Sequence, residues 1–217
     1  GEEGEKDWIR RSDASSFPYV IAITGGIASG KSSVSSYVAS LGSHTEALDC
    51  DKLGHRAYEK GSKCFEAVVA AFGSEVVDEA TGEINRRALG GIVFNPERPE
   101  AMPLLNSITW PAIKELAWAE LRGMRERGVR VCVMEAAILL EAGWDAWSDE
   151  VWVVVVPEDT AKGRLMARNQ LSEEEALKRI QSQMSNGERI GRAHVVVCNQ
   201  WTLEDTKQQV DKAWGGV

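Results

Sequence analysis

The chain has 217 residues, with 25 lysines and arginines against 33 aspartates and glutamates, and a formal net charge of −8. Hydrophobic residues make up 43% and charged residues 27%, which is typical of a folded globular protein and excludes extended disorder. The acidic balance argues against a general nucleic-acid or anionic-membrane binder, because both use a basic face. It allows an anionic ligand held by a few local cations.

Cysteine usage and hydropathy indicate the compartment. The four cysteines are scattered, without a CxxC pair or a histidine partner at zinc spacing. This pattern predicts reduced thiols in an intracellular, reducing compartment. The longest apolar stretches are about half of the ~20 residues that cross a bilayer, so we expect no membrane insertion. We expect a cytoplasmic location, and a mitochondrial one stays open if a segment precedes Gly1.

Residues 1–18 are charged and polar and predict a tail or linker before a domain over 19–217. Short, β-branched apolar runs predict five strands along that domain. They are Tyr19–Thr24, Thr45–Cys50, Val129–Met134, Val151–Val156 and His194–Cys198. Helical patterns lie between them, and no two strands follow each other as a hairpin. The alternation indicates an α/β protein with a five-stranded parallel sheet.

Helical periodicity dominates two longer segments. Residues 52–127 are mostly helical and predict an insertion after the second strand. Within it, Pro111 is expected in the first turn of a long helix, after Pro103 and two earlier prolines have interrupted the chain. Residues 158–190 form a charged helical stretch, and residues 203–214 suit a C-terminal helix.

The strongest motif is G-G-I-A-S-G-K-S over 25–32, which fits G-x-x-x-x-G-K-[ST] between a predicted strand and a predicted helix. Its fixed glycines admit backbone angles and close approaches that a β-carbon would block. Successive N–H groups then form an anion nest at the helix N-terminus. Lys31 is expected to bridge the β- and γ-phosphates, and Ser32 to ligate Mg²⁺. The expected nucleotide contacts are Gly25, Gly26, Ile27, Ala28, Ser29, Gly30, Lys31, Ser32 and Ser33.

Several enzyme classes share such a loop, and the rest of the chain favours a small-molecule kinase. A GTPase switch needs an NKxD motif for guanine, which is absent, and a motor ATPase needs larger domains. A kinase needs a carboxylate that orients the acceptor hydroxyl and accepts its proton. Asp49 and Asp51 stand at the end of the second strand and point the same way if that strand continues. One would face the acceptor or the metal, and the other would cap a helix.

Two further features suit phosphoryl transfer. Arg164 and Arg168 lie four residues apart on one helix face, as lid cations that offset developing charge or as a solvated face balanced by acids. Glu135 ends the third strand, where an acid near Mg²⁺ is expected, although a turn or helix cap is the alternative.

With these residues in hand, the sequence resembles the dephospho-coenzyme A kinase family, and most closely the kinase domain of the eukaryotic bifunctional coenzyme A synthase. The resemblance covers roughly residues 19–215. The segments that carry it are ITGGIASGKS (23–32), LDCDKLGHRAY (48–58), INRRAL (84–89), VCVMEAAILLEAGW (131–144), QSQM (181–184) and HVV (194–196).

The resemblance implies a three-layer P-loop kinase fold with a helical substrate-binding insertion and a helical lid over about 158–190. It implies an ATP-dependent dephospho-CoA kinase, which transfers the γ-phosphate of ATP to the ribose 3′-hydroxyl of dephospho-CoA. The products are coenzyme A and ADP, in the last step of coenzyme A biosynthesis. The expected cofactors are ATP and Mg²⁺.

Residue roles follow from the same resemblance. Asp51 falls on the general base or hydroxyl-orienting acid, and acts with Lys31 and Arg168 as the catalytic set. Arg164 and Arg168 fall on the lid arginines. Asn199 would sit near adenine, Arg86 would contact phosphates of the acceptor, and the metal would lie near Ser32, Asp49 and Glu135.

Three positions depart from the family pattern. Glu135 replaces an aspartate, Ala137 a proline and Asn169 an aspartate. The longer Glu135 leaves open whether it meets Mg²⁺ directly or through water. The parallel with the bifunctional enzyme also suggests that residues 1–18 follow an adenylyltransferase domain. The alternatives are another P-loop nucleoside or nucleotide kinase, and a catalytically silent nucleotide-binding module.

Overall fold

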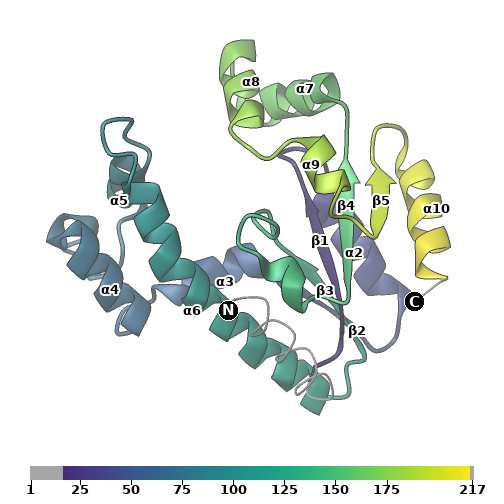
Figure 1. Cartoon of the computed structure of the whole chain (residues 1–217), viewed down its shortest axis with the longest axis horizontal. Coiled ribbons are helices and arrows are strands. Elements are labelled where there is room, and N and C mark those ends of the chain that lie inside the picture. Colours follow the sequence, from purple (N-terminus) through teal and green to yellow (C-terminus); the bar gives the residue numbers. More distant parts are fainter. Residues whose placement is uncertain (1–16, 216–217) are drawn as a thin grey trace. The chain divides into compact units, whose positions relative to one another are not determined.

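The computed structural model describes residues 17–215 (Figure 1). The predicted tail over residues 1–18 therefore lies almost wholly outside the described residues. The chain divides into two compact units. One comprises the residues up to Asp49 together with those from Leu121 onward, and the other is Cys50–Glu120.

The first unit is built on a parallel sheet of five strands, counted over residues 17–215. The strands are β1 (Tyr19–Gly25), β2 (Thr45–Asp49), β3 (Val131–Glu135), β4 (Glu150–Val155) and β5 (Val195–Cys198). Their order is β2-β3-β1-β4-β5, so the direction of winding reverses beside β1. In such sheets ligands bind beyond the carboxyl ends of the strands at that reversal. The predicted α/β class and five-stranded parallel sheet are confirmed.

Both faces of this sheet are covered. On one face, Ile21 and Ile23 of β1 pack with Val34 and Val38 of α2 (Lys31–Leu41) and with Val210 of α10 (Leu203–Trp214). The β1 residues that point the other way are equally buried, as expected for a parallel sheet between helical layers. A strand with no exposed face has to read as a continuous apolar run, which is how β1 was recognisable in the sequence.

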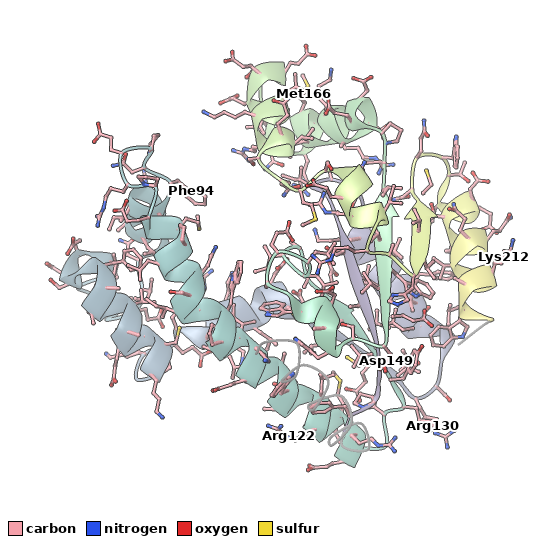
Figure 2. The ribbon with its side chains drawn as sticks, in the orientation of Figure 1. Phe94, Arg122, Arg130, Asp149, Met166 and Lys212 are labelled. Carbon is pink, nitrogen blue, oxygen red and sulfur yellow. The ribbon has the colours of Figure 1, made fainter. Side chains whose placement is uncertain are left out.

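The two ends of the sheet differ in what they carry. Beyond β4 the chain forms α7 (Glu158–Asn169), α8 (Glu173–Gln181) and α9 (Asn186–Ile190), and the last two each begin with a serine–glutamate capping box. Figure 2 labels Met166 on α7 at one end of the sheet and Asp149 at the other. There the Asp149 carboxylate accepts a hydrogen bond from the N–H of Val20 over 2.7 Å. The helical end is therefore the end that can hold a ligand.

The second unit is mainly helical within the described residues. It holds α3 (Cys50–Ala57), α4 (Lys63–Phe72), the short 3₁₀ helix η1 (Ser74–Val76), α5 (Arg86–Val93) and the first part of α6 (Ala101–Glu126). A single antiparallel bridge joins Val77 to Ile84. Its apolar core includes Leu53, Val68, Phe72 and Leu89, each less than a tenth exposed.

The prediction for Pro111 is wrong, because α6 begins at Ala101 and Pro111 lies inside it. Pro103 falls in the first turn, where a missing N–H costs nothing because those N–H groups have no helical partner. Inside a helix, proline removes one hydrogen bond and costs about 3 kcal/mol. The buried stripe that includes Ala117 and Leu121 outweighs this cost.

Neither α6 nor any other helix between residues 17 and 215 combines the length and apolarity needed to cross a membrane.

Candidate active site

The glycine-rich loop lies between β1 and α2 at the carboxyl end of the sheet, as its motif requires. Gly30 has φ +86°, in the left-handed region, and a β-carbon there would overlap the amide of Asn199. A β-carbon on Gly25 would overlap the carbonyl oxygen of Val154 in the neighbouring strand. The two fixed glycines are thus required by one backbone angle and by two close approaches.

Side chains distant in the sequence hold the second half of the loop. The Asn199 amide donates to the carbonyl of Ser29 over 2.8 Å and accepts a hydrogen bond from the Thr206 hydroxyl over 3.0 Å. The Arg164 guanidinium donates to the carbonyl oxygens of Asn199, over 2.8 Å, and of Ala28, over 3.4 Å. The structure thus brings Arg164 and Asn199 to the backbone of the loop, and both satisfy its outward carbonyl groups.

Oxygen donors gather on the other side of the loop. The Ser32 hydroxyl donates to the Glu135 carboxylate over 2.6 Å. Asp49, the last residue of β2, lies opposite Glu135 in the register of β2 and β3. The described residues hold no group of three or more histidines, cysteines, aspartates or glutamates that could bind a metal. Mg²⁺, however, is usually held by one or two carboxylates together with substrate phosphates, so this donor set suits it.

Lys31 and Arg168, the other two cations that the sequence predicts for the nucleotide, lie in surroundings unlike those of Arg164. Lys31 is the first residue of α2, directly after the loop, and Ser33 donates its N–H to the carbonyl of Gly30 over 3.1 Å. Arg168, one turn beyond Arg164 on α7, is exposed, and its Nε donates to the side-chain oxygen of Asn169 over 2.8 Å. At position 169, where the family pattern has an aspartate, Arg168 therefore has the neutral amide of Asn169 as its partner.

Asp51 and Arg86 belong to the second unit. Asp51 is exposed in the first turn of α3, two residues after the end of β2. Arg86 is the first residue of α5, whose start is capped by the Asn85 side chain accepting from the N–H groups of Arg87 and Ala88. Arg86 borders a pocket of about 370 Å³. The residues around that pocket are His55, Tyr58, Glu59, Glu83, Ile84 and Arg86.

Known proteins share this combination of loop, sheet and helices. The family model for dephospho-CoA kinase matches residues 19–205. The chain belongs to the dephospho-CoA kinase family. It is 41% identical over 195 residues to the dephospho-CoA kinase of Geobacter sulfurreducens, covering 90% of this chain and 96% of that one. The dephospho-CoA kinase of Symbiobacterium thermophilum is 41% identical over 196 residues, covering 90% and 80%.

Solved structures share the fold of this chain, and one of them is named a dephospho-CoA kinase. The crystal structure of TT1252 from Thermus thermophilus matches with a TM-score of 0.76 and 32% identity, covering 93% of this chain and 98% of that one. The dephospho-CoA kinase from Campylobacter jejuni matches with a TM-score of 0.65 and 26% identity, covering 89% and 94%. The match extends over both units, so the helical unit is part of what this dephospho-CoA kinase family member shares with solved proteins.

Sequence reasoning assigned no role to three residues that touch the first half of the loop. The Gln183 side-chain oxygen accepts from the N–H of Ile27 over 2.8 Å. Atoms of Gln183, Asn186 and Arg189 lie 3.5–4.0 Å from the position of a β-carbon on Gly26. Gln183 lies in the QSQM segment that carried the family resemblance, and that was the one available signal. These residues follow α8, where the chain returns to the loop.

Arg189 is the buried cation of this group. Its exposed fraction is 3%, and burial away from water lowers the pKa of its guanidinium. It borders a cavity of about 400 Å³ whose wall also includes Ile27 and Ser29 of the loop. The rest of the wall comes from Val156 and the start of α7, from the end of α8, and from the segment that leads from α8 into α9. The first half of the loop thus faces a half-open cavity whose wall carries the guanidinium of Arg189 and, at the start of α7, the acid Glu158.

Proposed function

We propose that this chain transfers the γ-phosphoryl group of ATP to the ribose 3′-hydroxyl of dephospho-CoA, giving coenzyme A and ADP. Membership of the dephospho-CoA kinase family supports the reaction. The observation that carries it is the loop between Gly25 and Ser32, whose left-handed Gly30 and position between β1 and the N-terminus of α2 suit it to a triphosphate. A loop of this kind at the N-terminus of a helix is an anion-binding site.

On the nucleotide side, the N–H groups at the start of α2 would bind the α- and β-phosphates. Lys31 would reach the β- and γ-phosphates as a mobile point charge. Arg164 and Asn199 act through the loop, because their hydrogen bonds to Ala28 and Ser29 keep its carbonyl groups turned outward. Arg168 is exposed on α7, and we propose that it joins the phosphates when a nucleotide binds.

On the acceptor side, we propose that Asp51 orients the ribose hydroxyl and accepts its proton. As the oxygen of that hydroxyl bonds to the γ-phosphorus, the bond to the bridging oxygen of ADP breaks. Arg86 would bind a phosphate of dephospho-CoA, because a guanidinium forms two parallel hydrogen bonds with a phosphate group. Its place on the rim of the pocket of about 370 Å³ supports this assignment.

Ser32, Asp49 and Glu135 would hold Mg²⁺. When bound, the ion neutralises charge on the β- and γ-phosphate oxygens. The chain's own part is to present a hydroxyl and two carboxylates from α2, β2 and β3 in one place. We expect transfer to stop when EDTA removes divalent cations and to return when Mg²⁺ is restored.

We also propose a reducing compartment for this protein. Cys50, Cys64, Cys132 and Cys198 form no disulfide within the described residues, and burial raises the pKa of Cys132 to about 12. A thiol with so high a pKa is inert at neutral pH. The cytoplasm is a compartment that fits this chemistry.

We also propose that an adenylyltransferase domain is joined to this chain. This proposal rests on the resemblance to the bifunctional synthase alone.

The test is an acceptor assay on the purified chain. ATP and Mg²⁺ are supplied with dephospho-CoA, uridine or AMP in separate reactions, ADP is measured by coupled oxidation of NADH, and products are identified by mass spectrometry. We expect ADP formation with dephospho-CoA, and a product that matches authentic coenzyme A. Lys31→Ala is the matched negative control, since it removes the phosphate contact without changing the acceptor unit.

Two results would overturn the proposal. Transfer to uridine or AMP with none to dephospho-CoA would indicate another nucleoside or nucleotide kinase. ATP binding without transfer to any of the three acceptors would indicate a nucleotide-binding module.

A further inference from the structure

Arg189 is a buried guanidinium whose hydrogen-bonding capacity is only partly used. One terminal nitrogen, Nη1, donates to the carbonyl of Met184. The other, Nη2, lies 3.7 Å from the carboxylate of Glu141, which is longer than a hydrogen bond. Nε is buried, and it makes no hydrogen bond with any of residues 17–215. A charged group in this state is unusual, because buried cations are normally fully bonded.

A neighbouring arginine shows what a structural role looks like in the same part of the chain. Arg192, three residues later, donates to the carbonyl of Leu140 over 2.9 Å and to the carboxylate of Asp145 over 2.6 Å. It remains partly exposed, so water can satisfy its other N–H groups. Arg189 has less water and weaker partners, and its desolvation lowers its pKa. Its placement therefore costs stability that packing alone does not require.

The location of Arg189 indicates what it could bind. Its Nη1 lies 3.5 Å from the position of a β-carbon on Gly26, in the first half of the phosphate loop. It shares the wall of the cavity of about 400 Å³ with Ser29, whose buried hydroxyl also lacks a partner among the described residues. Two buried donors with unused capacity therefore border one cavity beside a loop built for anions. An anionic oxygen would satisfy both.

We propose that Arg189 is a further phosphate-binding residue of this site and contacts the γ-phosphoryl group of the bound nucleotide. The inference rests on the proposed function, because it assumes that the loop binds ATP. The position along the loop selects the phosphate: the N–H groups next to α2 hold the α- and β-phosphates. Gly26 and Ile27 lie at the other end of the loop, which leaves the γ-phosphate for the residues that contact them.

The chemical role follows from charge. During transfer, the bond from the γ-phosphorus to the bridging oxygen breaks, the bond to the acceptor oxygen forms, and the acceptor proton moves to a carboxylate. Arg189 gains and loses no proton in this step. A guanidinium can bind two oxygens of the moving group at once, and its attraction is strongest where water is excluded. Its burial, which is a cost in the free protein, is then an advantage.

The test compares affinities for ATP and ADP, which differ only in the γ-phosphate. Titration calorimetry without acceptor is carried out on the wild type, Arg189→Met, Arg189→Lys and the control Arg192→Met. We expect Arg189→Met to lower ATP affinity about tenfold or more and ADP affinity less than about threefold. Arg189→Lys should recover part of the ATP affinity because it keeps the charge. Arg192→Met should change neither affinity by more than about threefold.

The outcomes separate this proposal from a packing role. If ATP and ADP affinities fall together in Arg189→Met, or neither falls, Arg189 does not contact the γ-phosphate and the proposal is wrong. If Arg189→Met does not fold, as judged by circular dichroism, the ATP-to-ADP affinity ratio of Arg189→Lys decides by the same criterion. The experiment contains no acceptor, so a protein that binds ATP but fails the dephospho-CoA assay would overturn the proposed function without deciding this one.

Discussion

The two units treat their predicted site residues differently. In the sheet unit, hydrogen bonds within the protein fix Ser32, Glu135, Arg164 and Asn199 around the phosphate loop. In the helical unit, Asp51 and Arg86 are exposed at the starts of short helices. If the proposed roles hold, a nucleotide meets a loop that side chains from distant parts of the chain already support. An acceptor meets side chains that are exposed to solvent. Substitutions in the two units should consequently change different kinetic constants.

The largest effect is expected in the helical unit. Asp51→Asn should lower kcat by roughly 10²–10⁴, because the acceptor hydroxyl loses its proton acceptor, and should leave ATP affinity unchanged. Steady-state kinetics and ATP titration measure the two quantities. Glu66→Gln, an exposed acid on α4 of the same unit, serves as the control. A large loss of ATP affinity in Asp51→Asn would contradict the assignment of the nucleotide to the sheet unit and of the acceptor to the helical unit.

The next effect tests whether the shape of the loop is set before the nucleotide arrives. Gly30→Ala places a β-carbon at φ +86° and against Asn199, at a cost of about 1–3 kcal/mol. ATP affinity should therefore fall about tenfold or more, while KM for the acceptor is unchanged. Gly163→Ala on α7 is the matched control, because its new β-carbon meets no described atom within 4 Å apart from its own stretch of helix. That control should stabilise the helix by about 0.5–1 kcal/mol, measured by thermal unfolding.

A smaller effect is expected at the rim of the pocket that we propose for the acceptor. Arg86→Met should raise KM for dephospho-CoA about tenfold, the loss of one charge-assisted contact with phosphate. Its KM for ATP should stay at the wild-type value. Arg87→Met, the adjacent exposed arginine on α5, controls for the loss of one positive charge. Equal effects of the two substitutions would show that general charge, and not the place of Arg86, attracts the acceptor.

The smallest effect concerns the helix that carries Arg189. Hydrogen bonds from the hydroxyl and the N–H of Ser185 hold the pKa of Glu188 below its usual range. A lowered pKa in the folded state stabilises the protein above the usual carboxyl pKa, and this contribution is lost as pH falls through the lowered value. Glu188→Gln should therefore lower the Tm by a few degrees at pH 7 and by less near pH 3. Glu174→Gln on α8 is the control, and a Tm difference independent of pH would contradict the assignment.

Much of the nucleotide side could be predicted from the sequence because its signals are local. A short, β-branched apolar run indicates a strand buried on both faces, and the glycine-rich motif that follows it predicts a loop before a helix. Asp49 and Glu135 were recognisable as acids at the ends of two predicted strands, and Ser32 as part of the motif; the carboxyl ends of parallel strands share one edge, where Asp49 lies opposite Glu135 and Ser32 bonds to it. The family resemblance then named the reaction class, and the comparisons confirmed it.

Tertiary structure alone decided what supports the loop. Ile27 and Gln183 are 156 residues apart, and Arg189 reaches Gly26 only because the chain returns from α8 to the sheet. No periodicity or spacing can encode a contact made by such a return. Pro111 is a case where long-range packing acts against a local preference. Proline favours the first turn of a helix, but burial of the apolar stripe of α6 keeps Pro111 inside that helix. The local sequence determines the phosphate loop, and long-range packing determines that Arg189 lies beside it.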